Sequence, residues 1–293
     1  MIKTGGHSDI LPLRSVLLKH PKDAFLDQDT LEENWEAYNY SSCPDFNRSL
    51  SEYESFIRLL RNCVTDIRFL PPSAQSGIDS IYVRDAAVAT DKGLVLGKMG
   101  KELRRFEPEA LGSYAENNGI PVLGRICGEG RLEGGDVFWM DESTIVVGEG
   151  PRTNAEGIRQ LKTLLQDLEV DVITVPLPEW DDPRDVFHLM SFFSPIDRKK
   201  AVVYPKLVPP VFQDLLEKKE YVLIEVPESE YDTLACNVLS LESGKCVIQT
   251  GNPVTIKNLK KQGITVWEYE GGEISQKGGG GPTCLTCPIL RTE

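Results

Sequence analysis

Residues 136–148 read Asp-Val-Phe-Trp-Met-Asp-Glu-Ser-Thr-Ile-Val-Val-Gly, with two apolar runs on either side of a polar turn. This pattern predicts a β-hairpin. The same pattern, with the same length and again with a turn in the middle, recurs from Asp85 to Gly97 and from Asn237 to Gln249. A related pattern, four residues longer, runs from His188 to Tyr204. A register shared by segments far apart in the chain indicates an internal repeat.

Each hairpin is followed by a helical pattern and a further strand. After Gly148, Asn154 is a candidate N-cap, the next apolar residues share one helical face, and 170–175 reads as a strand. The other helix and strand pairs are expected at 50–60 and 67–70, 109–118 and 120–123, 211–218 and 221–226, and 256–262 and 264–267.

The first repeat lacks a hairpin partner for its strand at 16–18, and residues 285–290 can supply it if the chain closes into a ring. Closure of that kind removes exposed sheet edges. The sequence therefore predicts an α/β fold, a five-bladed ββαβ propeller with a pseudo-five-fold repeat, formed by residues 1–293 as a single domain. The segment 21–45 does not fit the repeat, and a loop of this length is typical of a lid or of a disordered segment.

The composition is that of an ordinary globular protein. The chain has 293 residues, of which 40% are hydrophobic and 26% charged, and a net charge of −13. This charge argues against nucleic acid or an anionic membrane as partner. The N-terminal residues lack the pattern of a signal peptide, and no apolar run is long enough to span a bilayer. Seven cysteines without a disulfide pattern predict reduced thiols in the cytoplasm.

Reactive side chains stand at equivalent places of the repeat. In a closed ring these places converge on the axis, and the residues there are Asp85, Glu133, Asp136, His188, Asn237 and Cys284. Cys284 follows the run Lys277-Gly278-Gly279-Gly280-Gly281-Pro282-Thr283, whose glycines allow a tight turn and a close approach to a ligand. A thiol, an imidazole and several carboxylates can serve as nucleophile, acid–base group and anions for a cationic substrate.

Each of these residues alone has a plainer interpretation. Asp85 could be a turn residue paired with Arg84, His188 a core histidine beside Phe187, and the glycines at 134–135 a simple polar turn. Cys284 and Cys287 resemble half of a metal site, but a zinc site needs about four ligands, so no metal or other cofactor is expected. The common register of the set favours an active site.

The motifs also resemble those of the guanidine-modifying (pentein) superfamily. They are Asp79 with Arg84-Asp85, Leu132-Glu133-Gly134-Gly135-Asp136-Val137, His188-Leu189-Met190-Ser191, and Gly278 to Cys284. The resemblance implies a five-bladed ring of ββαβ units and a small guanidino substrate. The chain has no room for the inserted helical domain usual in arginine deiminases, and 150–154 is similar to a segment of dimethylarginine dimethylaminohydrolases.

The resemblance also implies roles for individual residues. Cys284 is the nucleophile, His188 the acid and base, and Glu133 and Asp85 hold the guanidinium. Asp136 orients its neighbours, Asp79 holds the substrate α-amine, and Arg104 and Arg152 hold its carboxylate. Arg84 and Met190 depart from the superfamily pattern, and Met190 could contact a methyl group on the leaving nitrogen.

The expected reaction is hydrolysis of Nω-methylated arginine to citrulline and a methylamine, through a covalent thiouronium. The alternatives are arginine deiminase, an amidinotransferase, and a non-catalytic binding protein on the same ring. Whether the protein forms a homodimer stays open.

Overall fold

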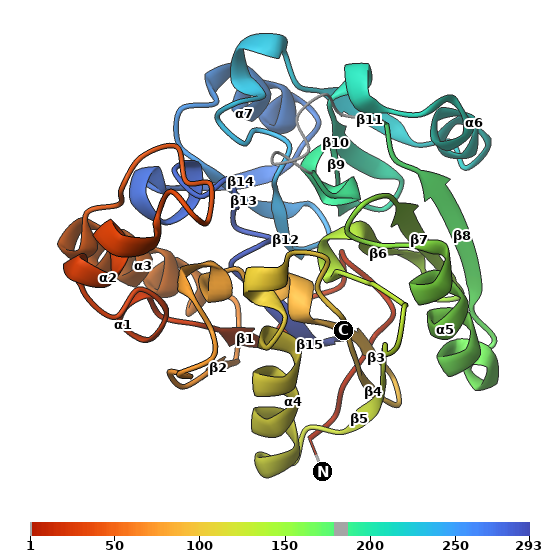
Figure 1. Cartoon of the computed structure of the whole chain (residues 1–293). Coiled ribbons are helices and arrows are strands. Elements are labelled where there is room, and N and C mark those ends of the chain that lie inside the picture. The colour runs from red at the N-terminus through yellow and green to blue at the C-terminus, as the bar shows by residue number, and fades with distance from the viewer. Residues whose placement is uncertain (1, 179–186) are drawn as a thin grey trace.

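The computed structural model describes residues 2–178 and 187–293, and the strands in these residues form five separate three-stranded sheets. In each sheet the middle strand pairs antiparallel with an inner strand and parallel with an outer one. The sheets surround a common axis, with the longer helices on the outside of the ring (Figure 1). The predicted α/β ring of ββαβ units is confirmed.

Each blade consists of an inner strand, a middle strand, a helix and an outer strand, and the inner strand of the first blade comes from the C-terminal end of the chain. The elements are β15 (Cys287–Arg291), β1 (Leu13–Leu18), α3 (Phe46–Leu60) and β2 (Asp66–Phe69); β3 (Ala87–Thr90), β4 (Gly93–Leu96), α4 (Glu107–Asn117) and β5 (Val122–Arg125); β6 (Val137–Asp141), β7 (Thr144–Glu149), α5 (Ala155–Leu165) and β8 (Asp171–Pro176); β9 (Phe193–Asp197), β10 (Lys200–Val203), α6 (Pro210–Lys218) and β11 (Val222–Glu225); β12 (Leu239–Glu242), β13 (Lys245–Gln249), α7 (Pro253–Lys261) and β14 (Thr265–Tyr269).

The hairpins form where the sequence predicted them. Val137 pairs with Val147 and Leu239 with Val247 in the same register relative to Asp136 and Asn237, whereas Ala87 pairs with Leu96 in a register shifted by one residue. The reactive residues therefore precede the inner strands: Asp85 lies just before β3, Asp136 before β6 and Asn237 before β12. Inner strands of neighbouring blades also contact one another, as β15 does with β3 and β9 with β12. This arrangement brings their ends together.

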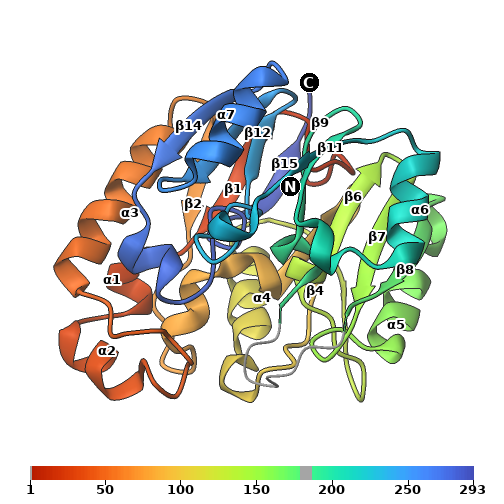
Figure 2. The same cartoon turned by 90° about the horizontal axis from the view of Figure 1, so that it is seen from above.

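The ring closes as the sequence predicted, because β15 pairs antiparallel with β1 in the first blade. Leu17 faces Cys287 across this pairing, and β1 pairs in parallel with β2 on its other side. Ile289 of β15 is fully buried in a cluster with Leu17, Leu94 and Leu111. The C-terminal strand thus packs against the core between the first two blades (Figure 2).

The segment 21–45 is not structureless, because it contains two short helices, α1 (Pro21–Ala24) and α2 (Gln28–Asn34). Asp27 caps α2 by accepting a hydrogen bond from the Thr30 amide at 2.8 Å. Phe25 and Leu31 are fully buried. Helices of four and seven residues are too short to produce a readable apolar period, which is why the sequence did not indicate them.

The packing of β15 yields a stability prediction. Ile289→Ala should lower the free energy of unfolding by about 2–5 kcal/mol, since it removes a fully buried side chain and leaves a cavity. Val254→Ala on the exposed face of α7 is the control and should change it by about 0.5 kcal/mol or less. Urea unfolding measures both, and an Ile289→Ala protein as stable as the control would contradict the ring closure.

Candidate active site

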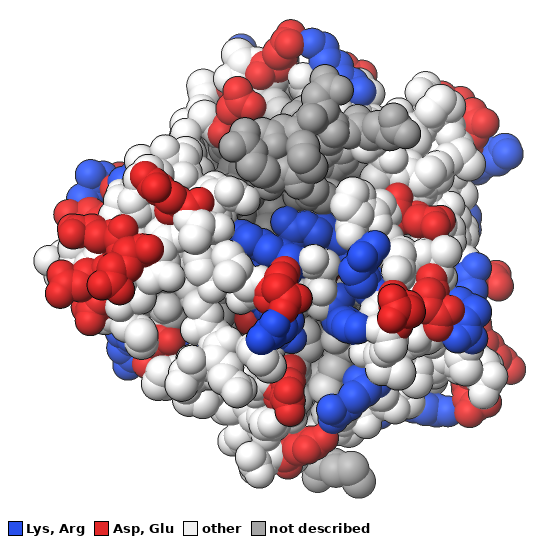
Figure 3. Space-filling model, viewed as in Figure 1, with Lys and Arg blue, Asp and Glu red and all other residues white. Residues whose placement is uncertain are grey.

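The ends of the inner strands meet at a pocket of about 930 Å³. Seven of the residues singled out from the sequence line it: Asp79, Asp85, Arg104, Arg152, His188, Asn237 and Cys284. Glu133 and Asp136 are fully buried, and Glu133 is hydrogen-bonded to His188. Lys and Arg side chains gather near the middle of the face drawn in Figure 3, and Lys101 and Arg152 are among the pocket's lining residues.

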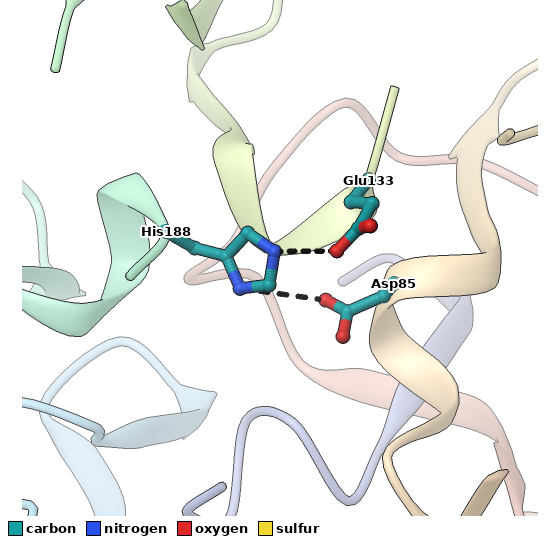
Figure 4. Close-up of side chains that lie close together, drawn as sticks. All are labelled: Asp85, Glu133 and His188. Atoms are coloured by element: carbon teal, nitrogen blue, oxygen red, sulfur yellow. Dashed lines mark hydrogen bonds and ion pairs between the residues drawn. The ribbon is translucent and has the colours of Figure 1, made fainter. Parts of the chain in front are cut away.

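His188 lies against two carboxylates (Figure 4). Its Nε2 is 2.7 Å from Glu133 Oε2, and its Nδ1 is 3.9 Å from Asp85 Oδ1. Burial alone would lower the pKa of His188, but the negative charges of Asp85, Asp136 and Glu133 outweigh it and raise that pKa to about 9. The imidazole is therefore protonated at neutral pH and can donate a proton.

Glu133 stays charged although its side chain is fully buried. Besides its bond to His188, it accepts hydrogen bonds from the Gly100 amide at 2.7 Å and from Arg152 Nη1 at 3.3 Å. Burial opposes ionisation, yet the hydrogen bond from His188 and the charge of Arg152 hold the pKa of Glu133 well below its usual range.

Asp85 is fixed by a backbone amide and an arginine. Its Oδ1 accepts from the Gly135 amide at 3.1 Å, and its Oδ2 pairs with Arg104 Nη1 at 2.6 Å. A Cβ at Gly135 would lie 2.7 Å from both Asp85 Oδ1 and the His188 ring, so the glycine permits this close packing. Arg84 does not pair with Asp85 as the plainer interpretation had it, but lies 3.1 Å from Asp9.

Asp136 is buried and is hydrogen-bonded to the backbone next to His188. Its Oδ1 accepts from the Leu189 amide at 3.0 Å, next to His188 in the chain. Burial outweighs the opposing charge of His188 and raises the pKa of Asp136 to about 6. These contacts fit the supporting role that the sequence suggested.

Cys284 is held by the loop that the glycine run builds. Asn237 donates from Nδ2 to Cys284 Sγ at 3.1 Å, and its Oδ1 accepts from the Thr283 amide at 3.0 Å. A Cβ at Gly281 would come within 2.6 Å of the Asn237 side chain. Burial and the nearby Asp85 raise the pKa of Cys284 to about 11, so the free protein carries a thiol. Cys287, in contrast, is fully buried in β15.

Two of the predicted substrate-binding residues are already engaged. Arg104 is 4% exposed and donates to Asp85, to Glu107 and to the Tyr82 carbonyl. Asp79 pairs with Lys101, whose Nζ lies 2.6 Å from Asp79 Oδ2 and 2.8 Å from the Tyr38 carbonyl. Sequence reasoning missed Lys101, because it lies in a loop outside the repeat register and belongs to none of the motifs.

Met190 lies in the wrong place for the role expected of it. It is 4% exposed and is absent from the described residues that line the pocket, although His188 and Ser191 are among them. The short 3₁₀-helix at Leu189–Ser191 explains this, since three residues per turn place 188 and 191 on one face and 190 on another. The suggestion that Met190 contacts a methyl group of the substrate is not supported.

One group of side chains has the spacing to hold a metal ion. Ligand atoms of Asp85, Glu133 and His188 all lie within 4.8 Å of one another. However, the imidazole between the two carboxylates is protonated at neutral pH, and a protonated imidazole cannot ligate a metal. The same geometry suits a planar cation with several N–H donors.

Comparison with known proteins agrees with this geometry. The model of the family described as N,N dimethylarginine dimethylhydrolase, eukaryotic, matches residues 21–291. The N(G),N(G)-dimethylarginine dimethylaminohydrolase of Pseudomonas aeruginosa is 28% identical over 244 residues, covering 83% of this chain and 89% of that protein. An arginine deiminase of Mycoplasma capricolum is 24% identical and covers 94% of this chain and 79% of its own length.

Solved structures show the same fold. A variant of the P. aeruginosa dimethylarginine dimethylaminohydrolase complexed with citrulline superposes with a TM-score of 0.77 at 25% identity, covering 95% of this chain and all of that one. The N-terminal domain of ArgZ, a cyanobacterial arginine dihydrolase, gives a TM-score of 0.79 at 19% identity, covering 94% and 97% of the two chains. The family model matches residues 21–291, and the solved structures share the fold. The chain therefore belongs to the N,N-dimethylarginine dimethylhydrolase family, whose members are amidine carbon–nitrogen hydrolases of the pentein superfamily.

Proposed function

We propose that this protein hydrolyses Nω-methylated arginine to citrulline and a methylamine through a covalent intermediate on Cys284. The observation that carries the proposal is that Cys284, His188 and Asp85 line one pocket, with Glu133 buried against His188. A nucleophile, a proton donor and two carboxylates for a guanidinium are the groups this reaction needs.

In the first step, the Cys284 thiolate forms a bond to the guanidinium carbon, and the bond from that carbon to the methylated nitrogen breaks. His188 gives a proton to the departing amine. In the second step, a water molecule gives a proton to His188 and attacks the same carbon. The carbon–sulfur bond then breaks, the second proton of the water passes to the solvent, and the ureido product leaves. The thiolate takes up a proton once the site is empty, which restores the thiol of the free protein.

The substrate itself activates the thiol in this scheme. The pKa of Cys284 is about 11 because burial and the negative charge of Asp85 both disfavour the thiolate. A guanidinium bound at Asp85 and Glu133 would neutralise that charge beside the sulfur. The pKa of Cys284 would then fall, and its proton would leave for the solvent.

Two considerations support the methylated substrate. The family is the first, since the relative from P. aeruginosa is named for dimethylarginine. The second is the apolar part of the pocket lining, contributed by Phe187, Tyr204, Leu207 and Leu234 from the fourth and fifth blades. A dimethylated nitrogen has no donor to satisfy there, whereas an unpaired buried donor costs about 1–3 kcal/mol.

Arginine deiminase is the second candidate, because arginine deiminases are also among the similar sequences. Amidino transfer differs from hydrolysis only in that an amine, rather than water, attacks the intermediate.

The segment 35–41 contributes Trp35, Tyr38 and Tyr40 to the pocket lining, which supports the proposal that 21–45 serves as a lid. A cytoplasmic location and a homodimer stay predictions.

The substrate and the nucleophile are tested together. We expect kcat/KM for Nω,Nω-dimethylarginine to exceed that for arginine by about ten-fold or more, with citrulline and dimethylamine as products. Cys284→Ser should abolish turnover, while the control Cys287→Ser keeps most of it. A higher kcat/KM for arginine, with release of ammonia, would establish the deiminase instead, and citrulline formation by Cys284→Ser would refute the covalent route.

We further propose that Lys101 and Asp79 recognise the α-amino acid end of the substrate. Their ion pair lines the pocket and offers one cation for a carboxylate and one anion for an amine. The donors of Arg104, by contrast, are already used by Asp85, Glu107 and Tyr82. Lys101, together with Arg152, is thus the better candidate for the substrate carboxylate.

Lys101→Met should raise KM for the methylated arginine by about ten-fold or more and leave kcat nearly unchanged, because a charge-assisted hydrogen bond contributes about 1.5–3 kcal/mol. For methylated agmatine, which lacks the carboxylate, the same variant should show a much smaller rise in KM. Lys206→Met is the matched control, since Lys206 also lines the pocket but pairs with the exposed Glu228. Equal losses for both substrates would mean that Lys101 only holds Asp79 in place.

A further inference from the structure

A second cavity lies between the inner strands β3, β6 and β15 and the N-terminal segment. It measures about 30 Å³ and shares no lining residue with the substrate pocket. Its lining includes His7, Asp9, Arg84, Trp139 and Arg291. We call it the inner-strand cavity.

Two buried guanidinium groups line this cavity, and one carboxylate accompanies them. Arg84 is 7% exposed and lies 3.1 Å from Asp9. Arg291 is 2% exposed and donates to the carbonyls of Leu11 and Ser240, at 2.7 and 2.8 Å. The cluster therefore carries one uncompensated positive charge, and an unpaired buried charge is strongly destabilising.

The remaining titratable group of the lining does not change this balance. His7 stacks on Trp139 with ring centroids 4.0 Å apart. Its Nε2 accepts from the Asp91 amide at 3.2 Å and its Nδ1 lies 3.1 Å from the Glu142 carbonyl, which is the pattern of a neutral ring. The Asp91 carboxylate is 3.9 Å from His7 and is 58% exposed, so it is largely solvated.

Arg291 also retains a donor without a protein partner. Its Nε is buried and has no hydrogen-bond partner among the residues that the structure describes. Burial and the neighbouring Arg84 lower the pKa of Arg291 to about 10, although Asp9 acts in the opposite direction. An orphaned donor can be satisfied by any acceptor, and on an incompletely balanced cation a negatively charged acceptor also compensates the charge.

We propose that the inner-strand cavity binds one monatomic anion of the size of chloride, held by Arg291 and Arg84. A volume of about 30 Å³ suits a single small ion or a water molecule. The anion neutralises the cluster and so stabilises the contact of the N-terminal segment with β15, where the Arg291 amide donates to the Gly5 carbonyl at 2.9 Å.

The test compares sodium chloride with sodium gluconate at equal ionic strength and pH, because gluconate is too large for the cavity. Chloride should raise the Tm of the wild-type protein saturably, by about 2–4 °C relative to gluconate. Arg291→Gln should abolish this difference. Arg125→Gln is the control and should keep it, since Arg125 is an exposed arginine outside the cavity, 59% exposed.

Crystals of the wild-type protein soaked in sodium bromide locate the ion without any variant, so the test holds even if Arg291→Gln does not fold. An anomalous peak within contact distance of Arg291 Nε supports the proposal. A wild-type Tm that is the same in both salts, water in the cavity of the bromide-soaked crystals, or a peak only in the substrate pocket near Arg152 would overturn it.

Discussion

Glu133 and Asp85 lie 2.7 and 3.9 Å from the imidazole nitrogens of His188, and both carboxylates are buried. Charges in such surroundings persist only if each is paired, and here the paired groups come from the second, third and fourth blades. Arg152 and the Gly100 amide complete the contacts of Glu133, while Arg104 and the Gly135 amide complete those of Asp85. The ring fold is what brings these groups together, and the chemistry of the site follows from their charges.

Much of this could be predicted from the sequence, because the same spacing of apolar runs around a turn recurs and indicates where each inner strand begins. Asp85, Asp136 and Asn237 could be placed at equivalent strand ends from that spacing alone, and the C-terminal strand could be assigned to the first blade. The alternation of apolar and polar side chains along a strand and a recurring turn are both visible in short stretches of sequence, so they can be read without knowledge of distant contacts. The family comparison then identified the same architecture independently.

What the sequence could not supply were contacts made by side chains outside the repeat. Lys101, which lies in an irregular loop, forms an ion pair with Asp79. Arg84 forms its ion pair with Asp9 of the N-terminal segment and not with its neighbour Asp85. Met190 follows His188 by two residues, yet the 3₁₀ turn directs it away from the pocket. Residue spacing predicts which strand end a residue occupies, whereas the direction of a side chain in a short turn depends on geometry that spacing does not encode.

The substrate cation, in the mechanism proposed for this site, creates the reactive thiolate. The rate at which neutral iodoacetamide alkylates Cys284 at increasing pH, followed by peptide mass analysis, tests this claim. With a pKa of about 11, the rate should still be rising at pH 10. Asp85→Asn should shift the profile to lower pH, because it removes a negative charge that opposes the thiolate. A profile that levels off below pH 8 in the free wild-type protein would show that the thiolate exists before substrate binds, and would contradict the mechanism.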